Sequence, residues 1–150
     1  MERNPPPSSE LVSRRMRNTP TRDTPAELAL RRLLHARGLR YRVDALPVKT
    51  LRRRADVAFG TTKVAVFVDG CFWHACPEHG SLPKANAAWW AEKLRTNVAR
   101  DRDTDAQLIA AGWRALRIWE HVPPERAGEL VVRAIAERRD HPAEGRNVHR

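Results

Sequence analysis

The chain has 150 residues, 41% of them hydrophobic, and a formal net charge of +10. That length suits one domain with a modest core, and no apolar run approaches the roughly 20 residues that a membrane-spanning helix needs. The lack of such a run excludes a membrane-embedded protein. The first residues also lack the apolar stretch of a secretion signal, which predicts a cytoplasmic protein.

The positive charge is concentrated in the first third of the chain. Residues 1–54 hold 14 Lys and Arg against 5 Asp and Glu, whereas residues 55–150 hold 14 against 13. Such an asymmetry favours a surface that binds a polyanion, although an arginine-rich composition alone would also produce it. We therefore expect contact with nucleic acid.

Residues 1–23 predict a flexible basic arm. They are rich in Pro, Ser, Asn and Arg and show no apolar period, which is typical of segments that are disordered when free. Thr24-Pro25-Ala26-Glu27 then predicts the start of a helix, because it offers an N-cap, a proline at the first helical position and a glutamate three residues after the cap. Leucines at helical spacing continue this helix, and Gly38 ends it.

Three strands are predicted after this helix. The first covers residues 39–46. The second and third cover residues 55–59 and 63–68, and the short connection that contains Gly60 predicts a hairpin.

The last third of the chain predicts two more helices around one strand. A long helix over residues 87–111 ends at Gly112, and residues 113–119 alternate as a strand. A final helix follows over residues 124–139, and residues 140–150 form a tail.

The predicted order within residues 24–139 is α-β-β-β-α-β-α. It describes one α/β domain with a mixed central sheet and no internal repeat. This order matches the core of restriction-endonuclease-like nucleases, which is an analogy of fold and does not by itself establish an activity.

Residues 64–79 hold the densest group of chemically active side chains. A buried-looking strand runs into Gly70, and both cysteines of the chain and two of its six histidines follow within ten residues: Cys71, His74, Cys76 and His79. Asp56 lies one strand upstream. A carboxylate, an imidazole and two thiols so close together indicate metal-assisted hydrolysis. In a cytoplasmic protein, thiols serve as metal ligands more often than as a disulfide.

The run Gly70-Cys71-Phe72-Trp73-His74 is the most specific motif, because two aromatic residues and a Cys/His pair seldom occur together by chance. With it the chain resembles the very-short-patch-repair (Vsr) DNA mismatch endonucleases over residues 14–139. The other matching stretches are Met16-Arg17 with Thr21 to Glu27, Arg54-Ala55-Asp56, and Trp90, Lys93, Asn97, Arg100-Asp101, Gly112-Trp113 and Trp119-Glu120.

The resemblance implies a monomeric, magnesium-dependent nuclease that nicks one strand of double-stranded DNA beside a T·G mismatch. Such a mismatch arises when 5-methylcytosine deaminates. The family also implies mismatch-repair proteins and a DNA polymerase as partners. Two alternatives remain: a nuclease of the same fold without mismatch preference, as in restriction or defence, and a zinc-stabilised DNA-binding module with an inactive nuclease site.

Asp56 is the strongest candidate catalytic residue. An aspartate at the start of a strand can simply end a sheet, but it can also bind Mg²⁺, which takes one or two carboxylates and several waters. By resemblance Asp56 is the catalytic aspartate, and the backbone carbonyl of Val68 is a second magnesium ligand. His74 is the candidate general base, since an imidazole can accept a proton from water at neutral pH. The rival role for His74 is that of a zinc ligand.

Asp69 and Glu27 are two further acidic candidates. Asp69 departs from the best-known family members, which carry histidine there. It could face the magnesium beside Asp56 or be a turn aspartate before Gly70. Glu27 is explained by the capping box with Thr24 alone, whereas the resemblance implies a role near the waters of the metal.

A structural zinc site is the second metal centre that we expect. The predicted ligands are Cys71, Cys76, His79 and His121, a tetrahedral set of two thiolates and two imidazoles that suits Zn²⁺. The spacing of these residues is irregular, so a disulfide and a pair of buried free thiols remain alternatives.

Aromatic and basic residues are the candidate DNA contacts. Phe72, Trp73 and Trp90 would on spacing alone be core residues, but the resemblance makes them a wedge inserted beside the mismatch, where unstacking is easiest. The basic residues predicted to contact the phosphate backbone are Arg14, Arg15, Arg17, Arg22, Lys93 and Arg100.

Overall fold

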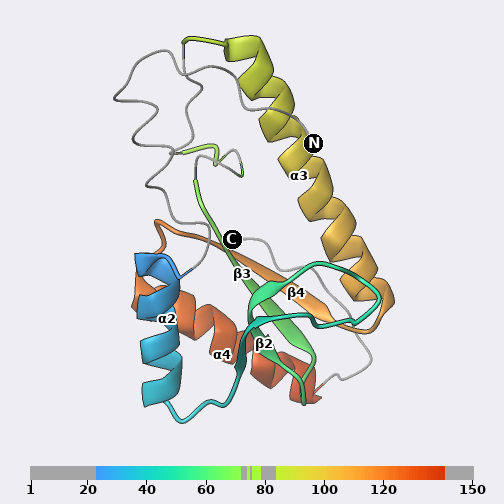
Figure 1. Cartoon of the computed structure of the whole chain (residues 1–150). Coiled ribbons are helices and arrows are strands. Elements are labelled where there is room, and N and C mark those ends of the chain that lie inside the picture. The colour runs from blue at the N-terminus through green and yellow to red at the C-terminus, as the bar shows by residue number, and fades with distance from the viewer. Residues whose placement is uncertain (1–22, 72–73, 75, 79–83, 141–150) are drawn as a thin grey trace.

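The computed structural model describes residues 23–71, 74, 76–78 and 84–140. Its elements follow the predicted order (Figure 1): α2 (Pro25–Ala36), β1 (Arg42–Ala45), β2 (Ala55–Phe59), β3 (Val64–Asp69), α3 (Ala87–Ala110), β4 (Arg114–Trp119) and α4 (Pro124–Asp140). Residues 1–22 of the predicted basic arm and residues 141–150 of the predicted tail lie outside the described residues. None of the helices in the described ranges has the length and hydrophobicity that a bilayer span requires.

The four strands form one mixed sheet in the order β1-β2-β3-β4. Strand β2 is antiparallel to both β1 and β3, whereas β3 and β4 are parallel. The predicted hairpin of β2 and β3 is confirmed. Its connection is closed by Lys63, whose φ of 56° lies in the left-handed region, rather than by Gly60.

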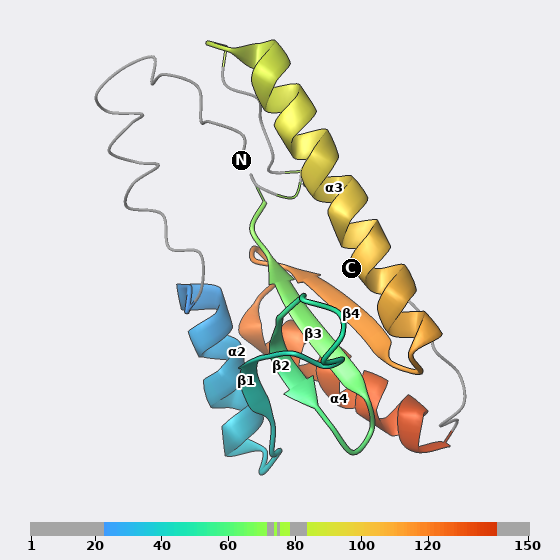
Figure 2. The ribbon, with the colours of Figure 1, turned by 45° about the vertical axis from the view of Figure 1, so that its right-hand side comes forward.

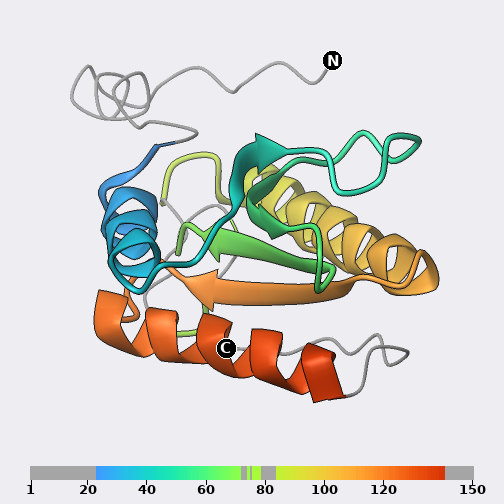
Figure 3. The same cartoon turned by 90° about the horizontal axis from the view of Figure 1, so that it is seen from below.

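Helices cover both faces of the sheet, as Figure 3 shows with α4 along one face and α3 across the other. The larger apolar core joins α2 and α4 to the sheet through alternate strand residues such as Val57, Val66 and Leu116. A smaller core lies on the other face, where Leu108 of α3 packs with Phe67 and Trp113. The alternation of strand side chains thus gives each face its own helix layer.

The start of α2 has the predicted cap. The Thr24 side chain accepts a hydrogen bond from the Glu27 amide at 3.3 Å, and Pro25 is the first helical residue. The Glu27 carboxylate in turn accepts from the Asp23 amide at 2.8 Å, one residue earlier than a regular capping box would have it. This cap fixes Glu27 in the first turn of α2, close enough to Asp56 for its charge to affect that carboxyl.

The first strand is shorter than predicted. Residues 39–41 do not join the sheet, because Leu39 and Tyr41 pack against the core as loop residues and the Tyr41 hydroxyl donates to the Arg31 carbonyl of α2 at 2.8 Å. The other elements agree with the sequence to within one residue at each end. In Figures 1 and 2 the first half of α3 extends past the carboxyl end of β3, where the candidate site lies.

Candidate functional site

Asp56 lies near the start of β2, against the end of β3. Its carboxylate accepts a hydrogen bond from the Val68 amide at 2.6 Å. Burial, and after it the charge of Glu27, raise the pKa of Asp56 to about 7, while the bond from Val68 and the nearby His74 act in the opposite direction. Burial and the neighbouring acids thus disfavour the ionised form of Asp56.

Glu27 is the neighbouring acid whose charge raises the pKa of Asp56 most. It is 6% exposed, and burial raises the pKa of its carboxyl although the Asp23 amide and Arg31 lower it. Asp69, which also raises the pKa of Asp56, contributes a third carboxyl. A divalent cation would relieve the repulsion among these acids, and carboxylate oxygens are the donors that Mg²⁺ prefers. The residues present therefore fit a magnesium ion.

His74 follows β3 in the loop and forms a pair with Asp101 of α3. The distance from His74 Nδ1 to Asp101 Oδ2 is 2.5 Å. Burial lowers the pKa of His74, but the Asp101 hydrogen bond and the charge of Asp69 outweigh it and raise that pKa above its ordinary value. With Nδ1 donating to Asp101, the lone pair of Nε2 is left to accept a proton.

Asp101 is the site residue that sequence reasoning missed. It belongs to the matching Arg100-Asp101 stretch, but 27 residues separate it from His74 in the chain. Its position in a polar stretch of α3 is that of an ordinary solvated acid. Only the packing of α3 against the sheet brings it to the loop.

Asp69 is the last residue of β3, so its interpretation as a turn aspartate is wrong. It is 2% exposed, and its carboxylate accepts from the Arg117 guanidinium at 3.1 Å. It also lies 3.9 Å from His74 Nδ1. Together with His74 and Asp101 it forms a group whose ligand atoms lie within 4.8 Å of one another, close enough to hold a metal ion. Its part in catalysis stays a prediction.

Three of the four predicted zinc ligands come together. The ligand atoms of Cys71, Cys76 and His121 lie within 4.8 Å of one another, and His79 lies outside the described residues. The Sγ atoms of Cys71 and Cys76 lie 3.2 and 3.9 Å from His121 Nδ1, on either side of the about 3.6 Å that tetrahedral zinc bonds would give. Both thiols are free in the structure, with no disulfide between Cys71 and Cys76.

The electrostatics of this thiol group also fit a metal ion. Burial and the adjacent Cys76 raise the pKa of the Cys71 thiol to about 11. Without a cation the Cys71 thiol is therefore protonated at neutral pH, whereas a bound zinc would stabilise its thiolate. Glu78, whose carboxylate lies 3.6 Å from His121 Nε2, adds an oxygen at the edge of this group.

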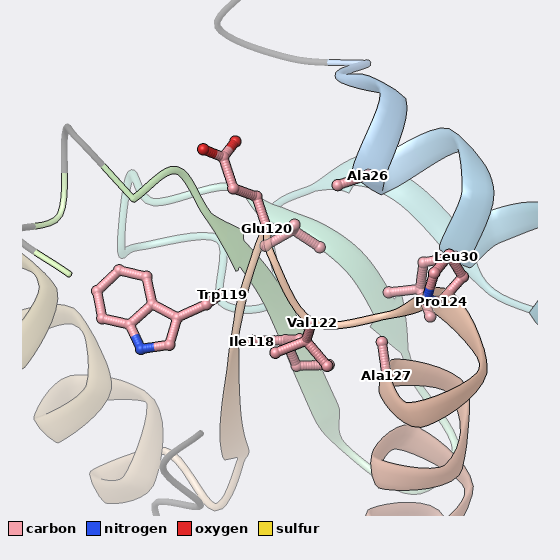
Figure 4. Close-up of a pocket in the computed structure, with 9 residues that line it drawn as sticks. Ala26, Leu30, Ile118, Trp119, Glu120, Val122, Pro124 and Ala127 are labelled. Carbon is pink, nitrogen blue, oxygen red and sulfur yellow. The ribbon is translucent and has the colours of Figure 1, made fainter. Parts of the chain in front are cut away.

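A small cavity lies among the first residues of α2, the ends of β3 and β4 and the start of α4 (Figure 4). It is bounded by Ala26, Leu30, Val68, Ile118, Trp119, Glu120, Val122, Pro124 and Ala127. The carboxylate of Glu120 points away from it in Figure 4 and accepts a hydrogen bond from the Cys71 amide at 3.1 Å. The cavity is therefore a gap in apolar packing, and Glu120 anchors the loop after β3.

The candidate DNA contacts fall into two sets. Phe72, Trp73 and the four arginines of the arm, Arg14, Arg15, Arg17 and Arg22, lie outside the described residues. Trp90 is 3% exposed in the first turn of α3, where its ring meets that of Trp89 edge-on at 4.9 Å. A ring so buried cannot intercalate unless this turn moves, so the wedge role of Trp90 stays a prediction. Lys93 is half-buried in the projecting first half of α3, and Arg100, just past the midpoint of this helix, is exposed.

Comparisons with known proteins agree with this geometry. The family model described as "DNA mismatch endonuclease Vsr" matches residues 9–78. The "Type II nicking enzyme V.NaeI" of Lentzea aerocolonigenes is 45% identical over 130 residues, which cover 85% of this chain and 78% of that protein. The "Type II nicking enzyme V.XorIIP" of Xanthomonas oryzae is 37% identical, over 70% of this chain and 76% of that protein. The "DNA mismatch endonuclease Vsr" of Escherichia coli is 38% identical, over 72% of this chain and 68% of that protein.

Two findings thus converge: an acid cluster beside a histidine–aspartate pair, and long matches to nicking and mismatch endonucleases. The chain belongs to the Vsr family of DNA endonucleases.

Proposed function

We propose that the protein is a magnesium-dependent endonuclease that nicks one strand of duplex DNA beside a T·G mismatch. The observation that carries the proposal is the arrangement of Asp56, with its raised pKa, close enough to the His74–Asp101 pair for His74 to affect that pKa. One group is suited to a hard cation and the other to accepting a proton, which are the two requirements of phosphodiester hydrolysis.

The magnesium ion would be held by the Asp56 carboxylate and the Val68 carbonyl, with Glu27 near its waters. When bound there, it supplies positive charge beside the scissile phosphate. Asp56 must be ionised to hold it, and the hydrogen bond from the Val68 amide orients the carboxylate for that task.

His74 performs the proton transfer in the proposed reaction. Its Nε2 accepts a proton from the attacking water while Asp101 stabilises the resulting imidazolium through Nδ1. The water oxygen bonds to phosphorus as the bond from phosphorus to the 3′ oxygen breaks, and the departing 3′ oxygen takes up a proton from solvent water. The products are a 5′-phosphate and a 3′-hydroxyl.

Mismatch selection is assigned to the aromatic residues Phe72, Trp73 and Trp90. Inserting apolar rings between base steps costs a few kcal/mol, and less at a mismatch than in a regular duplex. The basic residues of the arm and of α3 would add affinity through phosphate contacts without choosing a sequence. The bound zinc would hold the loop that carries Phe72, Trp73 and His74.

A second candidate is a nicking enzyme that requires no mismatch. Two of the relatives, V.NaeI and V.XorIIP, are named as Type II nicking enzymes. Both relatives align with most of the length of this chain. The same site could therefore act on duplexes with or without a mismatch.

Cleavage of end-labelled duplexes separates the two candidates. The twelve mismatches and the matched duplexes are each incubated with the protein, with and without Mg²⁺. We expect one nick in the T·G duplex only when Mg²⁺ is present, and at most slow cleavage of a matched T·A duplex. Equal nicking of both duplexes would favour the second candidate, and salt-sensitive binding without any cleavage would contradict both.

A further inference from the structure

Arg117 places a buried guanidinium among the acids beside His74. It lies in β4 and is 3% exposed. Its guanidinium carbon lies 4.3 Å from the centre of the Phe67 ring on β3. Burying an arginine is unfavourable unless its donors are paired. The partners of Arg117 therefore indicate which groups it holds in place.

Three carboxylates surround this one cation. Arg117 Nε donates to both oxygens of Asp105 at 2.8 and 2.9 Å, and Nη1 donates to Asp69 at 3.1 Å. Nη1 also lies 3.5 Å from Asp101 Oδ1, and Nη2 donates to the Asp101 backbone carbonyl at 3.4 Å. Arg117 thus connects α3, which carries two of these acids, with β3, which carries the third.

Asp101 stands between Arg117 and His74. One carboxylate oxygen of Asp101 faces the guanidinium, and the other binds His74 Nδ1 at 2.5 Å. The His74 amide donates to the Gly70 carbonyl at 3.1 Å, a bond that fixes the backbone but does not orient the ring. The orientation of the imidazole therefore depends on Asp101, and that of Asp101 on Arg117.

We propose that Arg117 is a positioning residue for the nicking reaction, acting through Asp101 to hold the His74 imidazole with Nε2 directed at the attacking water. The proposal rests on the proposed function, since it takes His74 as the base. Without the guanidinium, three like charges from Asp69, Asp101 and Asp105 would face one another, and Asp101 would turn away. The histidine would then lose its partner and its orientation.

Arg114 offers a matched control on the same strand. It is 6% exposed and forms an ion pair at 2.5 Å with Glu137 of α4. Replacing it removes a buried arginine and its ion pair from β4 without touching Asp101 or His74. Arg114→Gln therefore measures what such a loss does to the fold alone.

A double-mutant cycle measured by single-turnover nicking of the T·G duplex tests the proposal. At saturating DNA and Mg²⁺ we expect Arg117→Gln to lower the rate about 10- to 100-fold, as expected for loss of an oriented general base, and Arg114→Gln to change it less than about threefold. DNA affinity should stay within about threefold in both variants. In an Asp101→Asn background, Arg117→Gln should add less than about threefold, because residues that act through one another are not additive. The proposal would be overturned if the rate losses of Arg117→Gln and Asp101→Asn multiply in the double variant, or if Arg114→Gln lowers the rate as much as Arg117→Gln does.

Proton NMR of the free protein supplies a readout that needs neither DNA nor nicking. A short hydrogen bond between His74 Nδ1 and Asp101 should give a far-downfield imidazole proton resonance, assigned by its loss in His74→Ala. We expect it in the wild type and in Arg114→Gln, and its loss in Arg117→Gln; its persistence there would contradict the proposal. If the wild type does not nick DNA, the proposed function fails, while this comparison still tests the link from Arg117 to His74.

Arg117→Lys keeps the test decisive if Arg117→Gln does not fold. A lysine keeps the charge but cannot present a planar fork to three carboxylates. The expected result is a nicking rate between those of the wild type and Asp101→Asn, with a shifted resonance. A rate and a resonance like those of the wild type would overturn the proposal.

Discussion

At the scale of single residues, the Asp56 carboxyl is destabilising in the absence of a cation. Its pKa is raised from 3.8 to about 7, chiefly by burial. A group whose pKa is higher in the folded than in the unfolded state weakens the fold increasingly as the pH rises between those two values. Above pH 7 the metal-free protein therefore bears the full penalty of this charge.

Asp56→Asn should stabilise the metal-free protein while removing Mg²⁺-dependent nicking. The amide keeps an oxygen for the Val68 amide but carries no charge, so the free energy of unfolding in a chelator at pH 8 should rise by up to about 4 kcal/mol. At pH 4 the two proteins should be nearly equal. Thermal unfolding at both pH values measures the difference.

The exposed Asp103 is the control for this substitution. Its carboxylate accepts from Gln107 on the surface of α3, so Asp103→Asn should change stability by no more than about 0.5 kcal/mol and leave nicking intact. An Asp56→Asn protein that is less stable than the wild type at pH 8 would show that the carboxylate stabilises the fold, contrary to the expectation.

At the scale of elements, the loop after β3 depends on β4 for its position. Glu120 and His121, directly after β4, contact Cys71 at the start of the loop. The Cys76 amide also donates to the Cys71 carbonyl at 2.9 Å, which closes a turn around His74. A metal bound by the thiols and His121 would thus hold the general base in place as well as stabilise the loop.

His121→Ala should therefore lower both zinc content and nicking. We expect about one zinc ion per wild-type chain and a clear loss of bound zinc in the variant, with a lower melting temperature. Elemental analysis and thermal melting measure these changes. His35, an exposed residue in the last turn of α2, is the matched control, and His35→Ala should keep its zinc. Equal metal content in the two variants would rule out His121 as a ligand.

At the scale of the whole molecule, the site is assembled from parts that are distant in the sequence. Glu27 comes from α2, Asp56 from β2, His74 from the loop after β3, and Asp101 from α3. The order of these elements could be predicted because caps, glycines and apolar periods are local signals. Asp56 and His74 could be singled out because they belong to specific local motifs.

The contacts between elements could not be predicted in the same way. Asp101 and Arg117 meet across the interface of α3 and β4, which no local pattern encodes. The one available signal is that the apolar strand over residues 114–119 contains Arg114 and Arg117, because a charged residue in a buried strand requires a partner. That signal indicates an ion pair but not which acid forms it.

The most direct test is the single-turnover rate at which His74→Ala nicks a T·G duplex in Mg²⁺, with His35→Ala as the control for removal of a histidine. Loss of the general base should lower the rate at least about 100-fold while DNA affinity stays within about threefold, and His35→Ala should nick at the wild-type rate. Nicking by His74→Ala at the wild-type rate would contradict the assignment of His74 as the residue that accepts the proton from water.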